Sequence, residues 1–145
     1  MDIQNLCNSD SAEFNPLDIR AKNPTREDKL KYIKMMEKGC KNSHAFWNLA
    51  RLVRSHLRMK KWATELYQKA EETAESYDDY RLLAYPVLNY LKDRDRAITL
   101  YLKAEMAAKT YHNYENLGWM VGSLGYKEWS ERLYSKAGDL KQQIA

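Results

Sequence analysis

Three histidines and two cysteines are the side chains of this sequence best suited to hold a metal ion or to act in catalysis. Cys7 and Cys40 lie far apart in dissimilar contexts, which favours two reduced thiols over a structural disulfide. No glycine-rich phosphate loop, no His-Glu-x-x-His motif and no Cys-x-x-Cys pair occurs in the sequence. We therefore expect no catalytic residue, no metal site and no cofactor, and a protein that is not an enzyme.

The aromatic and charged side chains suit binding better than catalysis. The chain has eleven tyrosines and four tryptophans but only two phenylalanines. Aromatic rings that carry a polar group suit helix contacts whose edges are open to solvent. Hydrophobic residues make up 44% and charged residues 30% of the 145, which is typical of one globular domain. No secretory signal and no run of about 18 apolar residues occurs, so the sequence predicts a cytoplasmic protein without a membrane span.

The net charge of +4 is unevenly distributed. Between residues 17 and 61, thirteen lysines and arginines face four acids, whereas the first sixteen residues carry three acids and no base. From residue 62 onward, eleven bases meet thirteen acids. The excess positive charge therefore belongs to the first expected helices, where it could attract nucleic acid or an acidic protein.

Two strings recur along the chain and reveal an internal repeat. The first, Leu-Tyr-x-Lys-Ala, begins at Leu66, Leu100 and Leu133, so that its period is 34 and then 33. The second is an aromatic residue, then Leu followed by Ala or Gly, then Val, and it begins at Phe46, Tyr80 and Tyr114, again with a period of 34. Two interleaved strings that keep one period indicate a helical hairpin repeated three times.

These strings resemble those of the tetratricopeptide repeat (TPR) family over most of the chain, from residue 42 to 143. In that family, helix A carries the aromatic-Leu-small pattern and helix B carries Ala-x-x-x-aromatic-x-x-Ala. The second pattern occurs here from Ala63 to Ala70 and from Ala97 to Ala104, and Ser130 begins the third copy. The resemblance implies an all-α fold, a right-handed α-α superhelix of TPR-like helical hairpins with about seven helices.

The expected organisation is an N-terminal arm at 1–24 and a helical repeat domain at 25–145. A capping helix at 25–41, opened by a capping-box-like Thr25-Arg-Glu-Asp28, precedes repeats at about 43–76, 77–110 and 111–143. The sequence departs from the family pattern in three ways. The proline after helix B is missing, the first two repeats hold one extra residue between their helices, and Pro86 falls inside a helix A, where it should cause a kink.

The resemblance also implies which small and aromatic residues serve packing. Three small helix A residues should let helix B approach closely, namely Ala50, Ala84 and Gly118. Three helix B tyrosines should fill the gap to the neighbouring repeat, namely Tyr67, Tyr101 and Tyr134. Ala70 and Ala104 should lie at tight helix contacts, where a larger side chain would not fit.

In the TPR family, the helix A residues that do not serve packing line a concave groove that binds a peptide or protein segment. Carried over by register, the first repeat contributes His44, Trp47, Asn48, Arg51 and Ser55. The second contributes Asp78, Arg81, Tyr85 and Asn89, and the third contributes His112, Glu115, Asn116, Trp119 and Ser123. Tryptophan and arginine are enriched at binding hot spots. The alternative is that Trp47 and Trp119 pack against neighbouring helices and the arginines are merely solvated.

The partner expected from this wall is an internal peptide segment of mixed charge. A carboxylate clamp, which some family members use, is disfavoured because Asp78 and Glu115 would oppose an anion. His44 and His112 lie two repeats apart and cannot share a metal ion. The alternative partner is nucleic acid or an acidic protein bound by the first helices, at Lys29, Lys31, Lys34, Lys38, Lys41, Arg51, Arg54, Arg58, Lys60 and Lys61. No RNA-binding motif accompanies these residues.

Overall fold

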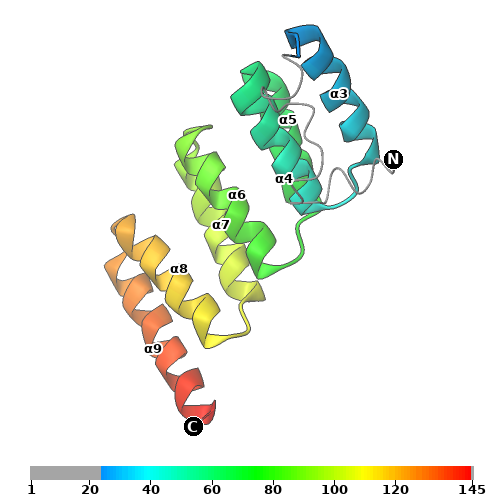
Figure 1. The fold of residues 1–145 in the computed structure, drawn as a ribbon. Helices are drawn as coiled ribbons and strands as arrows, with labels where there is room; N and C mark the ends of the chain where they lie inside the picture. The colour runs from blue at the N-terminus through cyan, green and yellow to red at the C-terminus, as the bar shows by residue number, and fades with distance from the viewer. Residues whose placement is uncertain (1–23, 145) are drawn as a thin grey trace. The chain divides into compact units, whose positions relative to one another are not determined.

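A computed structural model describes residues 24–144, and the regular secondary structure in that range is all helical, with no strand (Figure 1). The all-α class predicted from the repeat is confirmed. The chain divides into two compact units, Met1–Ala74 and Glu75–Ala145, and the division falls between the first and second expected repeats. Of the expected N-terminal arm, residues 1–23 lie outside the described part.

The first unit consists of a single helix followed by a helical hairpin. Helix α3 (Arg26–Gly39) packs on the hairpin, which is formed by α4 (Ser43–Leu52), the π-helical segment η1 (Val53–Leu57) and α5 (Lys60–Glu72). The wholly buried large side chains include one from α3 and four from the hairpin, namely Ile33, Leu49, Leu57, Leu66 and Tyr67. The capping helix and the first repeat therefore share one apolar core.

The capping box predicted at the start of α3 is present. The Thr25 hydroxyl accepts a hydrogen bond from the Asp28 amide at 3.1 Å, and the Asp28 carboxylate accepts one from the Thr25 amide at 3.1 Å. These two bonds satisfy two amides that have no partner within the helix. The hydrogen bonds from Thr25 lower the pKa of Asp28 below its usual value.

The second unit consists of two hairpins. Helices α6 (Tyr77–Asn89) and α7 (Arg94–Ala107) form the first, and α8 (Tyr111–Ser123) and α9 (Lys127–Ile144) form the second. Each helix contributes one wholly buried leucine that repeats with the sequence strings, namely Leu83, Leu100, Leu117 and Leu133. The Tyr77 hydroxyl on α6 donates a hydrogen bond of 3.0 Å to the Asn113 carbonyl, which ties the first turns of α6 and α8 together.

The connections between helix A and helix B accommodate the extra residue of the first two repeats. Each connection contains one residue with positive φ, namely Arg58 (54°), Lys92 (58°) and Gly125 (97°). In the first repeat, the π-helical turn of η1 takes up the extra residue. In the second, the Leu91 amide donates to the Pro86 carbonyl five residues back, which is the spacing of a π-helical bond.

Lys92→Gly is expected to stabilise the second unit by about 0.5–1 kcal/mol. A side chain in the left-handed region costs about 1–2 kcal/mol, part of which is offset by the greater freedom of glycine in the unfolded chain. Lys92→Val is expected to destabilise the protein, because a branched Cβ fits this region worst. Urea denaturation of both variants tests the assignment, and a lower stability for Lys92→Gly would contradict it.

At Gly118, helices α8 and α9 approach each other closely, as expected for a small helix A residue. A Cβ added there would lie 3.2 Å from two atoms of the Tyr134 ring and 3.4 Å from the Ser130 carbonyl oxygen. Ala50 and Ala84 are wholly buried, as expected. Tyr134 itself is 44% exposed, because its ring covers Gly118 and no helix follows α9 among the described residues to cover its other side.

Pro86 lies inside α6, as predicted, and is buried. The helix begins well before this residue at Tyr77 and ends three residues after it, so the proline occupies the last turn. Proline supplies no amide for the helical hydrogen bond at this position. A kink that widens the wall around Tyr85 and Asn89 stays a prediction.

Candidate functional site

The wall residues predicted in the first repeat form one cluster on α4, centred on Trp47. The His44 ring stacks on the Trp47 indole with centroids 5.9 Å apart and planes 18° apart. The Arg51 guanidinium lies 5.5 Å from the Trp47 ring centroid, and it also donates a long hydrogen bond of 3.4 Å to the Asn48 side chain. The indole is half-buried, whereas Arg51 is exposed.

The α4 cluster offers two kinds of contact to a ligand. A guanidinium held over an aromatic face is already ordered, so that less conformational entropy is lost when it binds. Its outward N–H groups could donate to a carboxylate or to a peptide carbonyl. Ser55, the last wall residue predicted in this repeat, lies in η1 and donates its hydroxyl to the Arg51 carbonyl at 2.9 Å.

The charged wall residues of α6 and α8 are paired within the second unit. Arg81 donates two hydrogen bonds to the Asp78 carboxylate, at 3.2 and 3.0 Å. Glu115 accepts a hydrogen bond of 3.0 Å from Lys141 on α9, and His112 lies 4.0 Å from the same carboxylate. The bond to Glu115 raises the pKa of Lys141 above its usual value. These pairs leave little net charge on this part of the wall.

Two aromatic side chains dominate the remainder of the second wall. Tyr85 on α6 is 65% exposed and Trp119 on α8 is 67% exposed. Their separation equals one period of the repeat, so they occupy the same position in successive repeats. Asn89 and Asn116 on the same two helices are also exposed, and the Asn89 amide donates to the Tyr85 carbonyl at 3.2 Å.

The structure excludes the burial of Trp119 that the alternative interpretation required, whereas Trp47 is intermediate. It brings His44, Trp47, Asn48 and Arg51 together on α4. In the second unit, α6 carries Arg81, Tyr85 and Asn89, and α8 carries His112, Glu115, Asn116 and Trp119. Each unit thus presents its own group of the predicted residues.

A pair of side-chain braces was missed by the sequence analysis. In the first unit, Glu37 on α3 accepts hydrogen bonds from the Trp62 indole at 3.3 Å and from Lys69 at 3.0 Å, both on α5. In the second unit, Glu105 on α7 accepts from the Trp129 indole at 3.4 Å and from Arg132 at 3.2 Å, both on α9. A carboxylate of one helix thus joins an indole and a cation of another.

The sequence did contain a signal for these braces. Glu37, Glu71 and Glu105 recur with a period of 34, and Trp62 and Trp129 each precede the first small residue of a helix B. The first repeated string continues into Glu71 and Glu105, and Glu37 lies one period before Glu71. Glu37 on α3 holds the position in this periodicity that Glu105 holds on α7.

Glu105→Ala is expected to lower the free energy of unfolding by about 1–2 kcal/mol. The Glu105 side chain is only 17% exposed, and its removal leaves the half-buried Trp129 indole without its hydrogen-bond partner. The ion pair with the exposed Arg132 is screened by solvent and contributes a smaller part of the loss. Glu131→Ala on the exposed side of α9 is the matched control and should change stability by less than about 0.5 kcal/mol. Equal urea midpoints for the two variants would contradict a stabilising brace.

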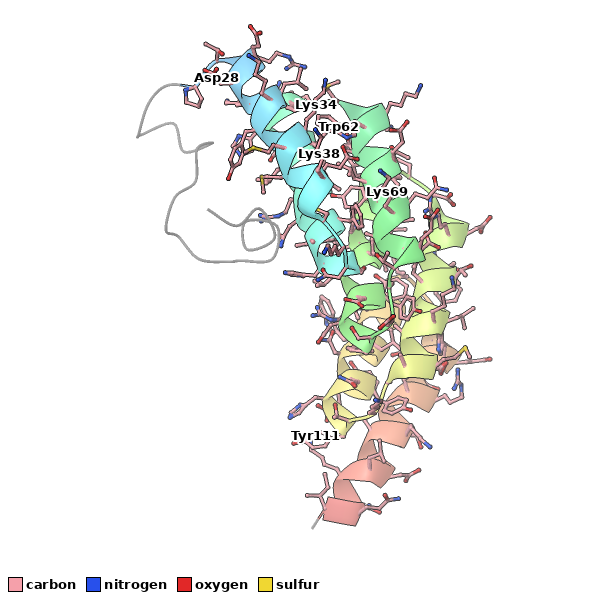
Figure 2. The ribbon with its side chains drawn as sticks, turned by 90° about the vertical axis from the view of Figure 1, so that its right-hand side faces the viewer. Asp28, Lys34, Lys38, Trp62, Lys69 and Tyr111 are labelled. Atoms are coloured by element: carbon pink, nitrogen blue, oxygen red, sulfur yellow. The ribbon has the colours of Figure 1, made fainter. Side chains whose placement is uncertain are left out.

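A cleft lies beside the first brace, between α3 and α5. Its volume is about 660 Å³, and its lining residues are Leu30, Lys34, Glu37, Lys38, Met59, Trp62 and Lys69. Figure 2 looks onto this side of the unit, with Lys34 and Lys38 on α3 beside Trp62 and Lys69 on α5. A second cleft of about 480 Å³ lies in the second unit and is lined by Glu105, Tyr114, Arg132, Leu133, Ser135, Lys136 and Asp139.

Two other kinds of site are absent from the part of the chain that the structure describes. Residues 24–144 hold no group of three or more His, Cys, Asp or Glu side chains placed to bind a metal ion. Over the same residues, no helix combines the length and the apolar character needed to cross a membrane.

No family model matches the chain, and no match was found among curated proteins or among solved structures. The resemblance to the TPR family therefore has its support in the repeated strings of the chain itself.

Proposed function

We propose that this chain is a TPR-like protein-protein interaction module that binds a peptide or protein segment along its helix A walls. The observation that carries the proposal is the pair Tyr85 and Trp119, each two-thirds exposed and one repeat apart. Exposing two large rings to water at the same position of successive repeats is unfavourable for an isolated domain. Such rings are the anchors that protein interfaces use most.

The polar residues around these rings favour an internal, extended segment as the ligand. Asn89 and Asn116 are exposed on the same helices, and their amides can donate to and accept from a peptide backbone. Arg81 and Glu115 are neutralised by Asp78 and Lys141, so that the second wall offers no concentrated positive charge for a terminal carboxylate. In the first unit, Arg51 over Trp47 would add one directed cation.

The proposed role is that of a scaffold, adaptor or chaperone-like module in the cytoplasm. Binding needs only the rings, amides and cations described above, and no cofactor enters the proposal.

Selection of binding peptides from a displayed random library provides the test. For a selected peptide, Tyr85→Ala and Trp119→Ala are each expected to weaken binding about 10- to 30-fold, or about 1.4–2 kcal/mol, in isothermal titration calorimetry. Both rings are exposed, so the free energy of unfolding should change by less than about 0.5 kcal/mol. Arg51→Ala should weaken binding by about 1–3 kcal/mol for peptides that reach the first unit.

Met106→Ala is the matched control for the aromatic variants. Met106 is a large apolar residue, 88% exposed, that lies on the helix B α7 and not on a wall helix. Its removal should leave peptide affinity unchanged within twofold. If Tyr85→Ala and Trp119→Ala bind selected peptides as tightly as the wild type does, the helix A wall is not the binding surface.

A further inference from the structure

The cleft between α3 and α5 combines an apolar floor with a basic rim. Leu30, Met59 and Trp62 supply apolar surface, and Lys34, Lys38 and Lys69 supply positive charge. Its volume of about 660 Å³ lies within the range of sites that hold a few side chains or a small molecule. Met59 is 37% exposed, and the flexible methionine side chain can adapt its shape to a ligand.

Glu37 is the one acid among the described residues that line this cleft, and its carboxylate already has hydrogen-bond partners. Glu37 accepts hydrogen bonds from Trp62 and from Lys69, so that these three side chains form a largely neutral brace. Lys34 and Lys38, in contrast, are exposed and have no ion-pair or hydrogen-bond partner among residues 24–144. They are four residues apart on α3 and therefore project from the same side of the helix.

The repulsion between Lys34 and Lys38 lowers the stability of α3 when no ligand is bound. Like charges at a spacing of four residues destabilise a helix by a few tenths of a kcal/mol. Lys31, one turn earlier, has Glu27 as its partner at 3.9 Å, whereas Lys34 and Lys38 have none among the described residues. The corresponding cleft of the second unit includes Asp139 beside Lys136 and thus has both signs on its rim. The excess of positive charge is specific to the first cleft.

We propose that the cleft between α3 and α5 is a second binding site, which accepts an acidic segment of a partner protein. Two carboxylates of the segment pair with Lys34 and Lys38, and an apolar side chain between them packs on Leu30, Met59 and Trp62. The site is formed by α3 and by a helix B, so that it is separate from the helix A walls. It goes beyond the proposed function, because the two surfaces can be occupied independently.

The lining favours an acidic peptide over nucleic acid. Among the described residues that line the cleft there is no arginine, although arginine is the usual residue for bidentate phosphate contacts. Trp62 is the one aromatic residue among the described residues that line the cleft, so successive bases would find no second ring on which to stack. A concave apolar floor between two cations suits a side chain flanked by carboxylates.

The probe is a fluorescein-labelled eight-residue peptide with one central Phe flanked by Asp and Glu, titrated into the full chain and followed by fluorescence anisotropy. We expect saturable binding that weakens as salt rises. The double variant Lys34→Gln/Lys38→Gln should weaken binding at least tenfold. Replacing the central Phe of the peptide by Ser should also weaken binding at least fivefold. Both lysines are exposed, so the fold is expected to persist, and circular dichroism checks this.

The double variant Lys109→Gln/Lys127→Gln is the matched control, because it removes the same charge from exposed positions of the second unit. It should change the affinity by less than twofold. In ¹H–¹⁵N NMR spectra, the Trp62 indole signal, assigned through Trp62→Phe, should shift on peptide addition, whereas that of Trp119 should not. This readout separates failure of the cleft from failure of the helix A wall.

Four outcomes would overturn the proposal. Equal weakening by both double variants would mean that only net charge attracts the peptide. Binding that is insensitive to the central Phe would exclude the apolar floor. Tighter binding of a single-stranded RNA oligonucleotide, competing with the peptide, would make this a nucleic-acid surface. A rise in peptide affinity when Asp2, Asp10 and Glu13 are replaced by their amides would make the acidic start of the chain the occupant instead.

Discussion

Ala104→Trp should lower the free energy of unfolding of the second unit by at least about 3 kcal/mol and leave it unfolded at moderate temperature. Ala104 is wholly buried on α7, at the second alanine of the helix B string. Protein interiors are packed as densely as organic crystals, so an indole in the place of a methyl group must displace neighbouring helices. Ala70 on α5 is equally buried, and Ala70→Trp should have the same effect in the first unit.

Met106→Trp is the control for this prediction. Met106 lies two residues further along α7 and is 88% exposed, so that the same ring at that position should meet only water. Far-ultraviolet circular dichroism during heating distinguishes the two variants. An Ala104→Trp protein that melts with the wild type would mean that the helix B register derived from the repeat is wrong.

Alkaline pH is expected to destabilise the second unit through Tyr77. This ring is buried at the start of α6, and burial raises the pKa of its hydroxyl from 10 to about 12. The neutral form is the one that donates to the Asn113 carbonyl. Because the pKa is higher in the folded state, this contribution is intact below pH 10 and is lost as the pH rises from 10 through 12. The loss reaches about 2–3 kcal/mol at the upper end.

Urea denaturation between pH 8 and 11.5 tests this dependence. Tyr77→Phe should lower stability by about 1 kcal/mol at pH 8, where the hydrogen bond to Asn113 is lost, and its stability should fall less steeply above pH 10. Burial raises the pKa of Tyr101 as well, and this residue titrates in both proteins. Tyr85→Phe, at an exposed ring, should retain the wild-type pH dependence. Parallel curves for wild type and Tyr77→Phe would contradict the assignment.

The repeated strings were sufficient to predict the helices and their buried faces. Leu66, Leu100 and Leu133 open the three copies of one string, and all three are wholly buried. Such positions follow from local geometry, since residues three and four apart share a helix face whatever the neighbours are. The capping box at Thr25 was predictable for the same reason, because all of its partners lie within four residues.

The exposure of Tyr85 and Trp119 was also predictable, because both lie one residue after the small helix A residue that faces helix B. The pairing of Glu115 with Lys141 was not, although both are visible in the sequence. They are 26 residues apart, and the distance between their side chains depends on how α8 and α9 pack. The repeat register predicts which helix face a residue lies on, but it does not predict which charged side chain that residue will pair with.

The sequence by itself determined that this chain is built of helical hairpins, where each helix lies and which leucines and alanines of the repeated strings each helix buries. Only the tertiary structure decided that η1 takes up the extra residue of the first repeat, that Tyr134 keeps an exposed side, and that Glu37 joins Trp62 to Lys69 beside a cleft. The first group of properties depends on interactions within one or two helical turns. The second depends on distances between helices, which are fixed when whole helices pack and which no short string of residues encodes.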